Sequence, residues 1–415
     1  MTQRLLFLII TIVFGHFSYA GGYRIALQGQ KQLAMGHTGV AVINSSELIF
    51  YNPGGLAFID TQFTASIGAN AIFSDINYQD EALGIFTGAE NKTSFPFSGY
   101  AAYKLNDWAS VGLGIYTPYG SQVAYPRDWA GSHLVNSIEL VSVFIQPTLS
   151  IKLNSKMSIG GGPIFSLSGV NFNRNLDRST TDENGNRSNV TIDQGGITAW
   201  GYNIGMFFKP NEKIGVGVNY RSEIRVKAED GTADFRNLPA TLPGNFDNVT
   251  FNATLPLPAE LTVGMSYQFN EKWLVAFDIN RTFWSAYESL DIFFSNGITS
   301  INPRNYQNTT NYRLGLQYVA NDKFTLRGGY YFDESPILNG FFSPETPRSD
   351  SNNFTAGITL NISSRLAIDA SVLYSYFEEV NASYDFYQEN GQTIPFEGFY
   401  TNSSFVPGLG LTYNF

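Results

Sequence analysis

The chain contains no cysteine, so disulfide bonds, thiol chemistry and cysteine–histidine zinc sites are all excluded. Histidine is also scarce: beyond the first twenty residues only His37 and His133 occur, and neither stands beside an obvious serine and aspartate arrangement. The sequence has no Gly-x-x-x-x-Gly-Lys phosphate loop. We therefore expect a protein that is not an enzyme, that needs no cofactor or metal, and that uses no ATP of its own.

Basic residues are outnumbered by acidic ones. The chain has 25 Lys and Arg against 35 Asp and Glu, for a net charge of -10, which argues against nucleic acid as a partner. Long hydrophobic runs are missing as well. After the N-terminus no stretch reaches about 18 consecutive apolar residues, which excludes membrane-spanning helices.

The N-terminus has the features of a secretory signal. Arg4 supplies a positive start, residues 5–14 form a short apolar core, and Ser18-Tyr19-Ala20 ends in small residues suited to signal peptidase. We predict that residues 1–20 are a signal peptide. Because no cysteine follows the expected cut, the mature protein is not expected to be a lipoprotein.

A short polar turn recurs along the chain at intervals of roughly 40–60 residues. Each copy joins two runs of alternating apolar residues, which is a hairpin signal. Two long strands fit between neighbouring copies, with a variable polar loop at their far end. Short turns at one end and long loops at the other are typical of a transmembrane β-barrel. The copies are Lys104-Leu105-Asn106-Asp107-Trp108, Lys152-Leu153-Asn154-Ser155-Lys156, Lys209-Pro210-Asn211-Glu212-Lys213, Gln268-Phe269-Asn270-Glu271-Lys272, Val319-Ala320-Asn321-Asp322-Lys323 and Asn361-Ile362-Ser363-Ser364-Arg365.

Apolar residues recur at every second position along strand after strand. At the C-terminus Leu409, Leu411, Tyr413 and Phe415 share one face, and glycine, threonine and asparagine occupy the other. A soluble sheet would turn such an apolar face inward. Many of these runs, however, have the length of a tilted membrane strand, and aromatic residues cluster near both ends as in interfacial girdles. We expect a lipid-facing outer wall; a large soluble β-sandwich or propeller is the alternative.

The alternation predicts about 14 strands, an even number, whose first and last members pair so that no edge is left in lipid. The predicted fold class is therefore all-β: a transmembrane antiparallel β-barrel spanning residues 61–415. A barrel of this width would leak unless something filled its lumen. The predicted strands are 61–76, 92–105, 108–117, 137–153, 157–172, 196–209, 214–228, 253–269, 273–294, 310–319, 324–334, 352–362, 366–380 and 402–415.

Residues 21–60 precede the first strand, do not alternate and are rich in apolar side chains. Apolar content of this kind seeks burial and argues against disorder. We expect a compact N-terminal hatch folded back inside the lumen as a plug. A disordered periplasmic tail is the alternative.

Further motifs occur in order along the mature sequence: Asn52-Pro53-Gly54, Asp128-Trp129-Ala130-Gly131, Gly217-Val218-Asn219-Tyr220-Arg221-Ser222-Glu223, Leu255-Pro256-Leu257-Pro258-Ala259, Trp284-Ser285, Phe332-Asp333-Glu334-Ser335-Pro336 and the terminal Phe415. Each is weak alone, but in this order and at these spacings they resemble the FadL family of outer-membrane transporters for long-chain fatty acids and other hydrophobic compounds, including aromatic hydrocarbons. The chain departs from the family at Gly54, where the hatch motif has alanine; glycine makes that turn more permissive.

The resemblance implies a bacterial outer-membrane barrel plugged by its hatch. It also implies uptake by the outer loops, passage to an inner hydrophobic pocket, and exit sideways through the wall where an early strand kinks. Gly112, Gly114, Pro118 and Gly120 make the third strand the candidate for this lateral gate, because proline cannot donate to a ladder and glycine weakens one. The alternative is that Pro118 simply begins the loop.

Substrate binding requires apolar surface and one cation for a carboxylate head. Because each buried methylene contributes about 0.8 kcal/mol, a long acyl chain binds mainly through its tail. Arg174, after the fifth strand, is the candidate for the head group, and the family resemblance also places an arginine there; a solvated loop charge is the alternative. The parity near Phe165 is ambiguous, because the preceding glycines can bulge the strand. The candidates for the apolar lining are Phe165, Leu167, Phe172, Met35, Leu48, Phe50 and Leu56.

Charges that face the lumen are expected to anchor the hatch or to satisfy one another, because a charge facing lipid costs about 2–4 kcal/mol at mid-bilayer. The expected inward charges are Arg221, Glu223, Arg225, Arg313, Arg327, Asp278, Asp333 and Asp369.

The leading hypothesis is passive outer-membrane transport of hydrophobic small molecules, with long-chain fatty acids as the substrates that the resemblance favours. A surface adhesin or receptor and a general diffusion porin are the alternatives; the apolar content of residues 21–60 favours the transporter over the porin. Expected partners are the substrate, outer-membrane lipid and the barrel-assembly machinery, which would recognise Phe415. We expect a monomer that binds no nucleic acid.

Overall fold

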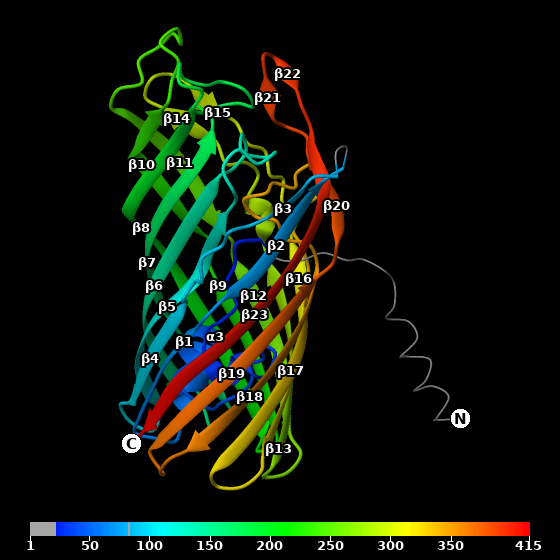
Figure 1. Cartoon of the computed structure of the whole chain (residues 1–415). Helices are drawn as coiled ribbons and strands as arrows, with labels where there is room; N and C mark the ends of the chain where they lie inside the picture. Colours follow the sequence, from blue (N-terminus) through cyan, green and yellow to red (C-terminus); the bar gives the residue numbers. More distant parts are fainter. Residues whose placement is uncertain (1–21, 82–83) are drawn as a thin grey trace, which may run out of the picture.

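A computed structural model describes residues 22–81 and 84–415 of the chain. Strands form nearly all of it, wound into a tall barrel with short turns at one end and long loops at the other (Figure 1). In this described part of the chain, no helix combines the length and the apolar character needed to cross a membrane. The predicted signal peptide, residues 1–20, lies outside the described residues.

The wall is a closed antiparallel barrel of 14 strands, which confirms the predicted fold class. β1 (Phe63–Asn70) pairs with β23 (Phe396–Asn414), and this register joins the first strand to the last. Three of the fourteen carry a break and therefore have two labels each: β1 with β2, β9 with β10, and β11 with β12. Besides β1 and β23, the labelled segments of the wall are β2 (Phe73–Asp80), β4 (Phe97–Lys104), β5 (Ala109–Ala124), β6 (Ser137–Lys152), β7 (Met157–Asn175), β8 (Asn189–Asn211), β9 (Ile214–Arg221), β10 (Ile224–Arg236), β11 (Val249–Leu257), β12 (Glu260–Gln268), β13 (Trp273–Thr282), β16 (Thr309–Val319), β17 (Phe324–Asp333), β18 (Ser351–Asn361) and β19 (Leu366–Phe377).

Short elements lie among the long loops at the upper end of Figure 1. By the usual asymmetry of such barrels, this end is the extracellular one and the short turns are periplasmic. The short elements are β3 (Phe86–Gly88), the 3-10 helix η2 (Trp284–Ala286), β14 (Ile292–Phe294), β15 (Thr299–Ser300), β20 (Val380–Tyr384), β21 (Gln388–Glu389) and β22 (Gln392–Thr393).

The recurring polar turn has one common geometry. Between β12 and β13, the Oδ1 atom of Asn270 accepts hydrogen bonds from the backbone N–H groups of Lys272 (2.9 Å) and Trp273 (3.0 Å). An Asx-type turn of this kind satisfies backbone donors where the ladder ends. The same pair of bonds is made by Asn106, Asn154, Asn211 and Asn321, and by the hydroxyl of Ser363.

Alternation puts apolar side chains on the outer face of the wall. On β23, Leu411 is 48% exposed, whereas its neighbour Thr412 is 1% exposed. Exposed Trp108 and Trp273 lie beside the short turns. An outer band of apolar residues flanked by aromatics is the surface that a membrane-spanning barrel presents to lipid, so the predicted parity of these strands is confirmed.

The parity changes where β9 ends. Arg221 points inward and is buried, but Ser222 and Glu223 lie outside the ladder, so that Ile224 faces inward next and Arg225 is exposed. The expectation that Arg225 faces the lumen is therefore wrong. A similar break at residues 258–259 separates β11 from β12. Below these breaks the lumen is lined by polar side chains, and above them by apolar ones.

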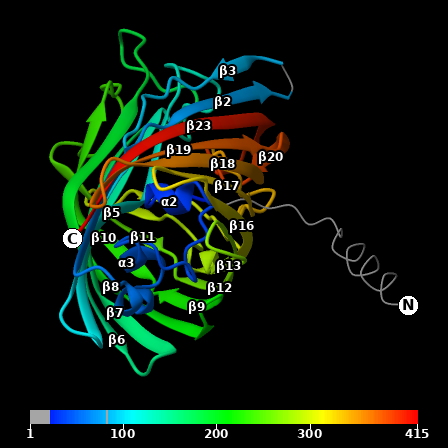
Figure 2. The ribbon, with the colours of Figure 1, turned by 90° about the horizontal axis from the view of Figure 1, so that it is seen from below.

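Residues 22–57 are almost entirely buried and lie within the ring of strands, where Figure 2 shows α2 (Gln30–Leu33) and α3 (Leu48–Tyr51). The 3-10 helix η1 (Pro53–Phe58) follows them. Wall glycines permit the close approach: a Cβ on Gly217 would lie 1.9 Å from the carbonyl oxygen of Val40, and one on Gly329 would lie 2.1 Å from the backbone nitrogen of Gly36. Glycine is needed where a backbone comes this near.

Candidate functional site

An apolar cavity lies inside the upper part of the barrel. The parity change places alternate side chains of β10 and β11 in its lining, together with the upper parts of β6, β7 and β8. Tyr23 contributes an aromatic ring from the N-terminal segment. The apolar lining comprises Tyr23, Leu134, Ile138, Leu140, Val170, Phe172, Ile192, Ile197, Val226, Ala228, Phe251, Ala253, Leu255, Tyr287, Leu290 and Ile292.

Polar groups meet at one side of the apolar cavity. Arg304 forms a buried ion pair with Glu345. Arg174, at the end of β7, donates hydrogen bonds only to neutral oxygens, the carbonyl of His133 and the hydroxyl of Ser300, both at 3.1 Å. The charged lining residues are thus two arginines and one glutamate, and Arg174 makes no ion pair with any described carboxylate. One positive charge is left without an acidic partner.

His133 does not add a second charge to this region. Burial, helped by the nearby Arg178 and Arg174, lowers the pKa of His133 to about 4. The imidazole is therefore neutral at neutral pH, and Arg174 is held by the backbone carbonyl of His133 rather than by its ring.

The structure places the predicted lining residues in three different locations. Phe172 and Arg174 do line the apolar cavity. Phe50 lies over the guanidinium of Arg221, whose central carbon is 4.0 Å from the ring centroid, and lines a smaller polar cavity below. Met35, Leu48 and Leu56 are buried between the N-terminal segment and the wall, outside the apolar cavity.

Phe165 and Leu167 face outward, so the expectation that they line the pocket is wrong. Leu167 is 42% exposed, and Phe165 packs against the exposed Trp200 with ring centroids 4.9 Å apart. The glycine run before them does not bulge the strand, because β6 and β7 keep one register on both sides of it. Even-numbered residues therefore face the lumen, and Ile164 is fully buried.

Sequence reasoning missed most of the lining. Val226 was missed because the alternation below it, where Val218 faces outward, assigns even-numbered residues to the lipid face. Ile197 could have been found, because β8 keeps one parity from its lower end up to this residue. Tyr23 gave no signal as an isolated residue near the expected cleavage point. Its ring meets Trp284 and Tyr287 edge-on, with centroids 4.9 and 5.5 Å away.

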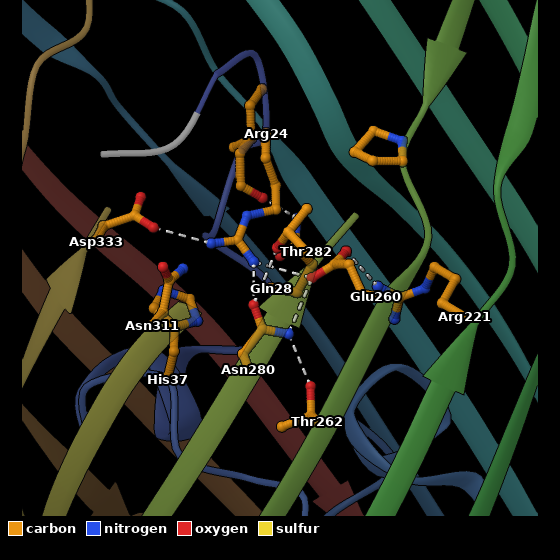
Figure 3. Close-up of polar contacts among 12 residues, drawn as sticks. Arg24, Gln28, His37, Arg221, Glu260, Thr262, Asn280, Thr282, Asn311 and Asp333 are labelled. Carbon is orange, nitrogen blue, oxygen red and sulfur yellow. Dashed lines mark hydrogen bonds and ion pairs between the residues drawn. The ribbon is translucent and has the colours of Figure 1, made fainter. Parts of the chain in front are cut away.

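A polar network fixes the start of the N-terminal segment to the wall (Figure 3). Arg24 forms ion pairs with Glu260 of β12 (2.9 Å) and Asp333 of β17 (3.1 Å), and it donates a hydrogen bond to Asn280 of β13 (2.7 Å). Glu260 also pairs with Arg221 at 3.1 Å. Three wall strands, each more than 200 positions from Arg24 in sequence, therefore hold one arginine side chain.

Other inward charges also contact the N-terminal segment. Asp278 accepts hydrogen bonds from the backbone N–H groups of Gly39 (2.8 Å) and Val40 (3.2 Å), and Lys31 lies 3.9 Å from Asp369. These contacts match the predicted anchoring network.

The motif Asn52-Pro53-Gly54 joins α3 to η1 and ties the segment to the wall. The amide nitrogen of Asn52 donates to the carbonyls of Val40 (2.7 Å) and of Met206 on β8 (2.9 Å), while its oxygen accepts from the N–H of Gly54 (3.1 Å). Pro53 begins η1, where its missing N–H costs nothing. The Asn52-Pro53-Gly54 motif thus makes one tight turn with a wall contact.

β5 carries an irregularity in its register with β6 between Tyr116 and Tyr119, which leaves one extra residue on β5. Its pairing with β4 stops at Tyr116. At this bulge the N-terminal segment pairs with β5 from inside: Ile25 donates to the carbonyl of Pro118 (2.8 Å), and Gly120 donates to the carbonyl of Tyr23 (3.1 Å). Pro118 therefore lies within the strand, not at the start of a loop.

Gly112 and Gly114 lie below the bulge in unbroken pairing with both β4 and β6. A Cβ on either would collide with the side chain of Ile49, at 2.7 and 2.9 Å. The prediction that Gly112 and Gly114 lie in a kink is therefore not supported. Glycine is needed at these two positions because α3 packs against them. Of the four predicted gate residues, Pro118 and Gly120 are the ones at the irregular site.

A side cavity lies beside the upper part of β5. It is bordered by residues 92–97 of the segment before β4 and by residues 119–123 of β5. Ser121, Leu140 and Thr346 line both this side cavity and the apolar cavity. The two spaces are therefore neighbours, separated by a few side chains.

Among the described residues, no group of three or more His, Cys, Asp or Glu side chains could hold a metal ion. A closed barrel with an apolar outer wall, polar anchoring of its own N-terminal segment and an apolar internal cavity defines a class: a β-barrel transport protein of the bacterial outer membrane. Residues 11–415 match the sequence profile of the family described as outer membrane protein transport protein (OMPP1/FadL/TodX). The chain belongs to this family, whose members transport hydrophobic compounds across the outer membrane.

Two relatives illustrate the sequence likeness. A predicted outer membrane protein of Neisseria meningitidis serogroup B is 26% identical over 447 aligned residues, which cover 96% of this chain and 95% of that one. The long-chain fatty acid transport protein of Escherichia coli K12 is 21% identical over 411 residues, covering 89% and 91%.

Two solved structures illustrate the likeness of fold. A Pseudomonas aeruginosa FadL homologue superposes with a TM-score of 0.83 at 21% identity, covering 95% of this chain and 100% of that one. The Pseudomonas putida toluene transporter TodX superposes with a TM-score of 0.73 at 19% identity, covering 93% and 98%.

Proposed function

We propose that this protein carries long-chain fatty acids, or amphiphiles with the same combination of a long apolar tail and a carboxylate, passively across the outer membrane. The observation that carries the proposal is Arg174, a partly buried guanidinium beside an apolar cavity and without an acidic partner. A cation that is partly removed from water loses solvation, and a negative group can compensate this loss. A carboxylate headgroup would do so, while the tail fills the apolar lining.

The proposal distinguishes fatty acids from uncharged hydrocarbons. The TodX neighbour is named a toluene transporter, and toluene would use only the apolar lining. A charge-assisted hydrogen bond contributes about 1.5–3 kcal/mol, so Arg174 would strengthen the binding of a carboxylate about tenfold to a hundredfold over an uncharged molecule of the same shape.

Binding of oleate, methyl oleate and toluene to the purified protein in detergent tests this idea by calorimetry. Arg174→Met should weaken oleate binding about tenfold to a hundredfold and leave methyl oleate and toluene unchanged. Arg178→Met is the matched control, because Arg178 is a nearby arginine that is half exposed and pairs with Glu389. Equal affinity of the unaltered protein for oleate and its ester would rule out recognition of the carboxylate.

We further propose that the N-terminal segment is a hatch that closes the lumen. Its burial, its polar network and the wall glycines support a segment that stays in place during transport. Deleting residues 21–60 should then convert a non-conducting protein into an ion-conducting pore in planar bilayers. An intact protein that already conducts like an open porin would contradict the plug and favour the diffusion-porin alternative.

The same reasoning makes the β5 bulge the proposed exit. Because the side cavity adjoins the apolar cavity and the upper edge of β5 is unpaired with β4, substrate could leave sideways into the bilayer. Deleting Pro118 removes the extra residue and should stop uptake by cells while leaving binding intact. Recognition of Phe415 by the barrel-assembly machinery and a monomeric state complete the proposal; Phe415→Ala should lower the amount of folded protein in the outer membrane.

A further inference from the structure

A second interruption of the wall lies between β8 and β10. β8 pairs with β9 up to Asn203↔Arg221, and it pairs with β10 again from Asp193↔Thr232 upward. Between these points, within the described chain, residues 194–201 of β8 and 224–231 of β10 have no ladder pairing with each other. The gap in pairing spans roughly eight residues, or about 26 Å along the strands. We call it the β8–β10 seam.

Each edge of the seam is paired with another wall strand on its far side, and both edges are bent at the same height. β8 pairs with β7 and β10 pairs with β11 along this stretch, so neither edge is a loose loop. Each of those ladders has a register shift here: Gly196 (φ 71°) lies at the one on β8, and Asp230 (φ 54°) lies at the one on β10. A bulge bends its strand and increases the local twist. Between Asn203↔Arg221 below the seam and Asp193↔Thr232 above it, the register of the two edges shifts by one residue.

The contacts that cross the seam at its two ends involve side chains. A Cβ placed on Gly201 would lie 2.5 Å from Cγ1 of Ile224, so this side chain fills the space between the two strands at the lower end. At the upper end the amide of Gln194 donates to the carbonyl of Glu229 (3.0 Å). Separating these edges needs side-chain rearrangement, whereas opening a paired seam would break a row of ladder hydrogen bonds.

The seam leads directly into the apolar cavity. Ile197 on its β8 edge and Val226 and Ala228 on its β10 edge line that cavity. In contrast, the loops above the cavity are closely packed: Arg304 and Glu345 form their buried ion pair there. Tyr125 and Trp129 stack in the same loop layer with centroids 4.0 Å apart. A path through the wall meets fewer fixed contacts than a path along the barrel axis.

Outward side chains place the seam at the outer membrane–water boundary. Tyr202 and Tyr220, whose centroids are 6.0 Å apart, lie at its lower end, as residues of an interfacial girdle do. Above them Arg225 and Lys227 face outward and are exposed. Unpaired backbone groups are not tolerated in the hydrocarbon region, but they can bond to water and polar headgroups at this height. The seam therefore opens toward the headgroup layer of the outer leaflet.

We propose that the β8–β10 seam is a lateral inlet, through which hydrophobic molecules already dissolved in the outer leaflet enter the apolar cavity. Uptake and exit then use different parts of the wall, the seam between β8 and β10 and the bulge of β5. This inference rests on the proposed function, because it takes the apolar cavity to be the place where the transported molecule binds.

A reversible cross-link tests the inlet, and the absence of native cysteine makes the experiment clean. Gly201→Cys with Ile224→Cys should form a disulfide that holds the two edges at the observed separation. The matched control is Leu326→Cys with Ile358→Cys, an outward-facing pair directly opposed in the unbroken ladder of β17 and β18. Uptake of radiolabelled oleate is measured in cells that lack their own transporter, before and after dithiothreitol, and oleate binding is measured on the purified variants.

The oxidised seam pair should take up oleate at least tenfold more slowly than its reduced form, with equilibrium binding within twofold, and the control pair should be unaffected. Equal rates for the oxidised and reduced seam pair would overturn the inlet. Loss of oleate binding in the unaltered protein would instead refute the proposed function, so the two failures are distinguishable. If the seam pair does not fold, Thr198→Cys at the exposed mouth replaces it: a bulky maleimide there should slow uptake tenfold, and unchanged uptake would overturn the proposal.

Discussion

Removing the Arg24 side chain should release the first residues of the N-terminal segment from the β5 bulge. Arg24 is 7% exposed and forms ion pairs with both Glu260 and Asp333. Burial alone would lower the pKa of Arg24, but the facing carboxylates of Glu260 and Asp333 more than offset this and raise it. The guanidinium is therefore charged and its partners depend on it.

The magnitude follows from what remains after Arg24→Ala. Glu260 keeps Arg221 as a partner, but Asp333 has no second ion pair among the described residues. Breaking a buried pair by removing one member costs about 3–5 kcal/mol. Since only one carboxylate, that of Asp333, loses its sole ion-pair partner, we take the lower value of about 3 kcal/mol for the cost of the substitution. This corresponds to a change of about 150-fold in the equilibrium between the docked and released segment.

Hydrogen exchange followed by mass spectrometry measures this directly. The amides of Ile25 and Gly120 bond across the contact between the segment and β5, so their protection should fall about 100-fold in Arg24→Ala. Adding Asp333→Asn should recover part of the loss, because the abandoned charge is then removed. Unchanged protection in Arg24→Ala would refute the idea that this ion pair holds the segment in place.

Three further changes test other parts of the structure. Gly329→Ala should displace the segment at Gly36 and raise bilayer conductance, whereas Gly328→Ala, whose Cβ would meet nothing nearer than 3.9 Å, should not. Asn270→Ala should lower the free energy of unfolding in urea by about 1–2 kcal/mol, since two N–H groups lose their acceptor; no change would show that water replaces it fully. Burial raises the pKa of Glu47 from its ordinary value of 4.5 to about 7, although the nearby Lys31 opposes the shift, and Asp369 adds to it. Because the folded value lies above the unfolded one, the stability contributed by the protonated form is present at low pH and is lost as pH rises from the unfolded pKa through 7. Protection factors of the segment amides, which correct for the faster intrinsic exchange at higher pH, should therefore be lower at pH 8 than at pH 6, and Glu47→Gln should remove most of that difference.

Much of the barrel could be predicted because its signals are local. The Asn270 turn and its copies mark hairpins through contacts between residues two or three positions apart, and the alternation of Leu409 and Leu411 marks the lipid face. Period-two patterning needs no knowledge of the partner strand. Arg174 could be proposed for the same reason, as a cation at the end of a readable strand.

The failures arose where parity depends on a neighbour. Arg225 faces outward because two residues after Arg221 leave the ladder, and Leu167 faces outward because the glycine run before it does not. Composition alone predicts neither outcome, because both glycine and polar residues can either continue a strand or form a β-bulge. A shift of one residue along the strand moves a side chain from the lumen-facing side of the wall to the lipid-facing side.

The sequence by itself determined that this is a membrane barrel with a long leading segment, since alternation, turn chemistry and the scarcity of apolar runs are properties of neighbouring residues. Only the tertiary structure decided which side chains share the apolar cavity, which carboxylates hold Arg24, and where the wall is left unpaired. Those relations join residues up to several hundred positions apart, and they depend on the register and closure of all strands together.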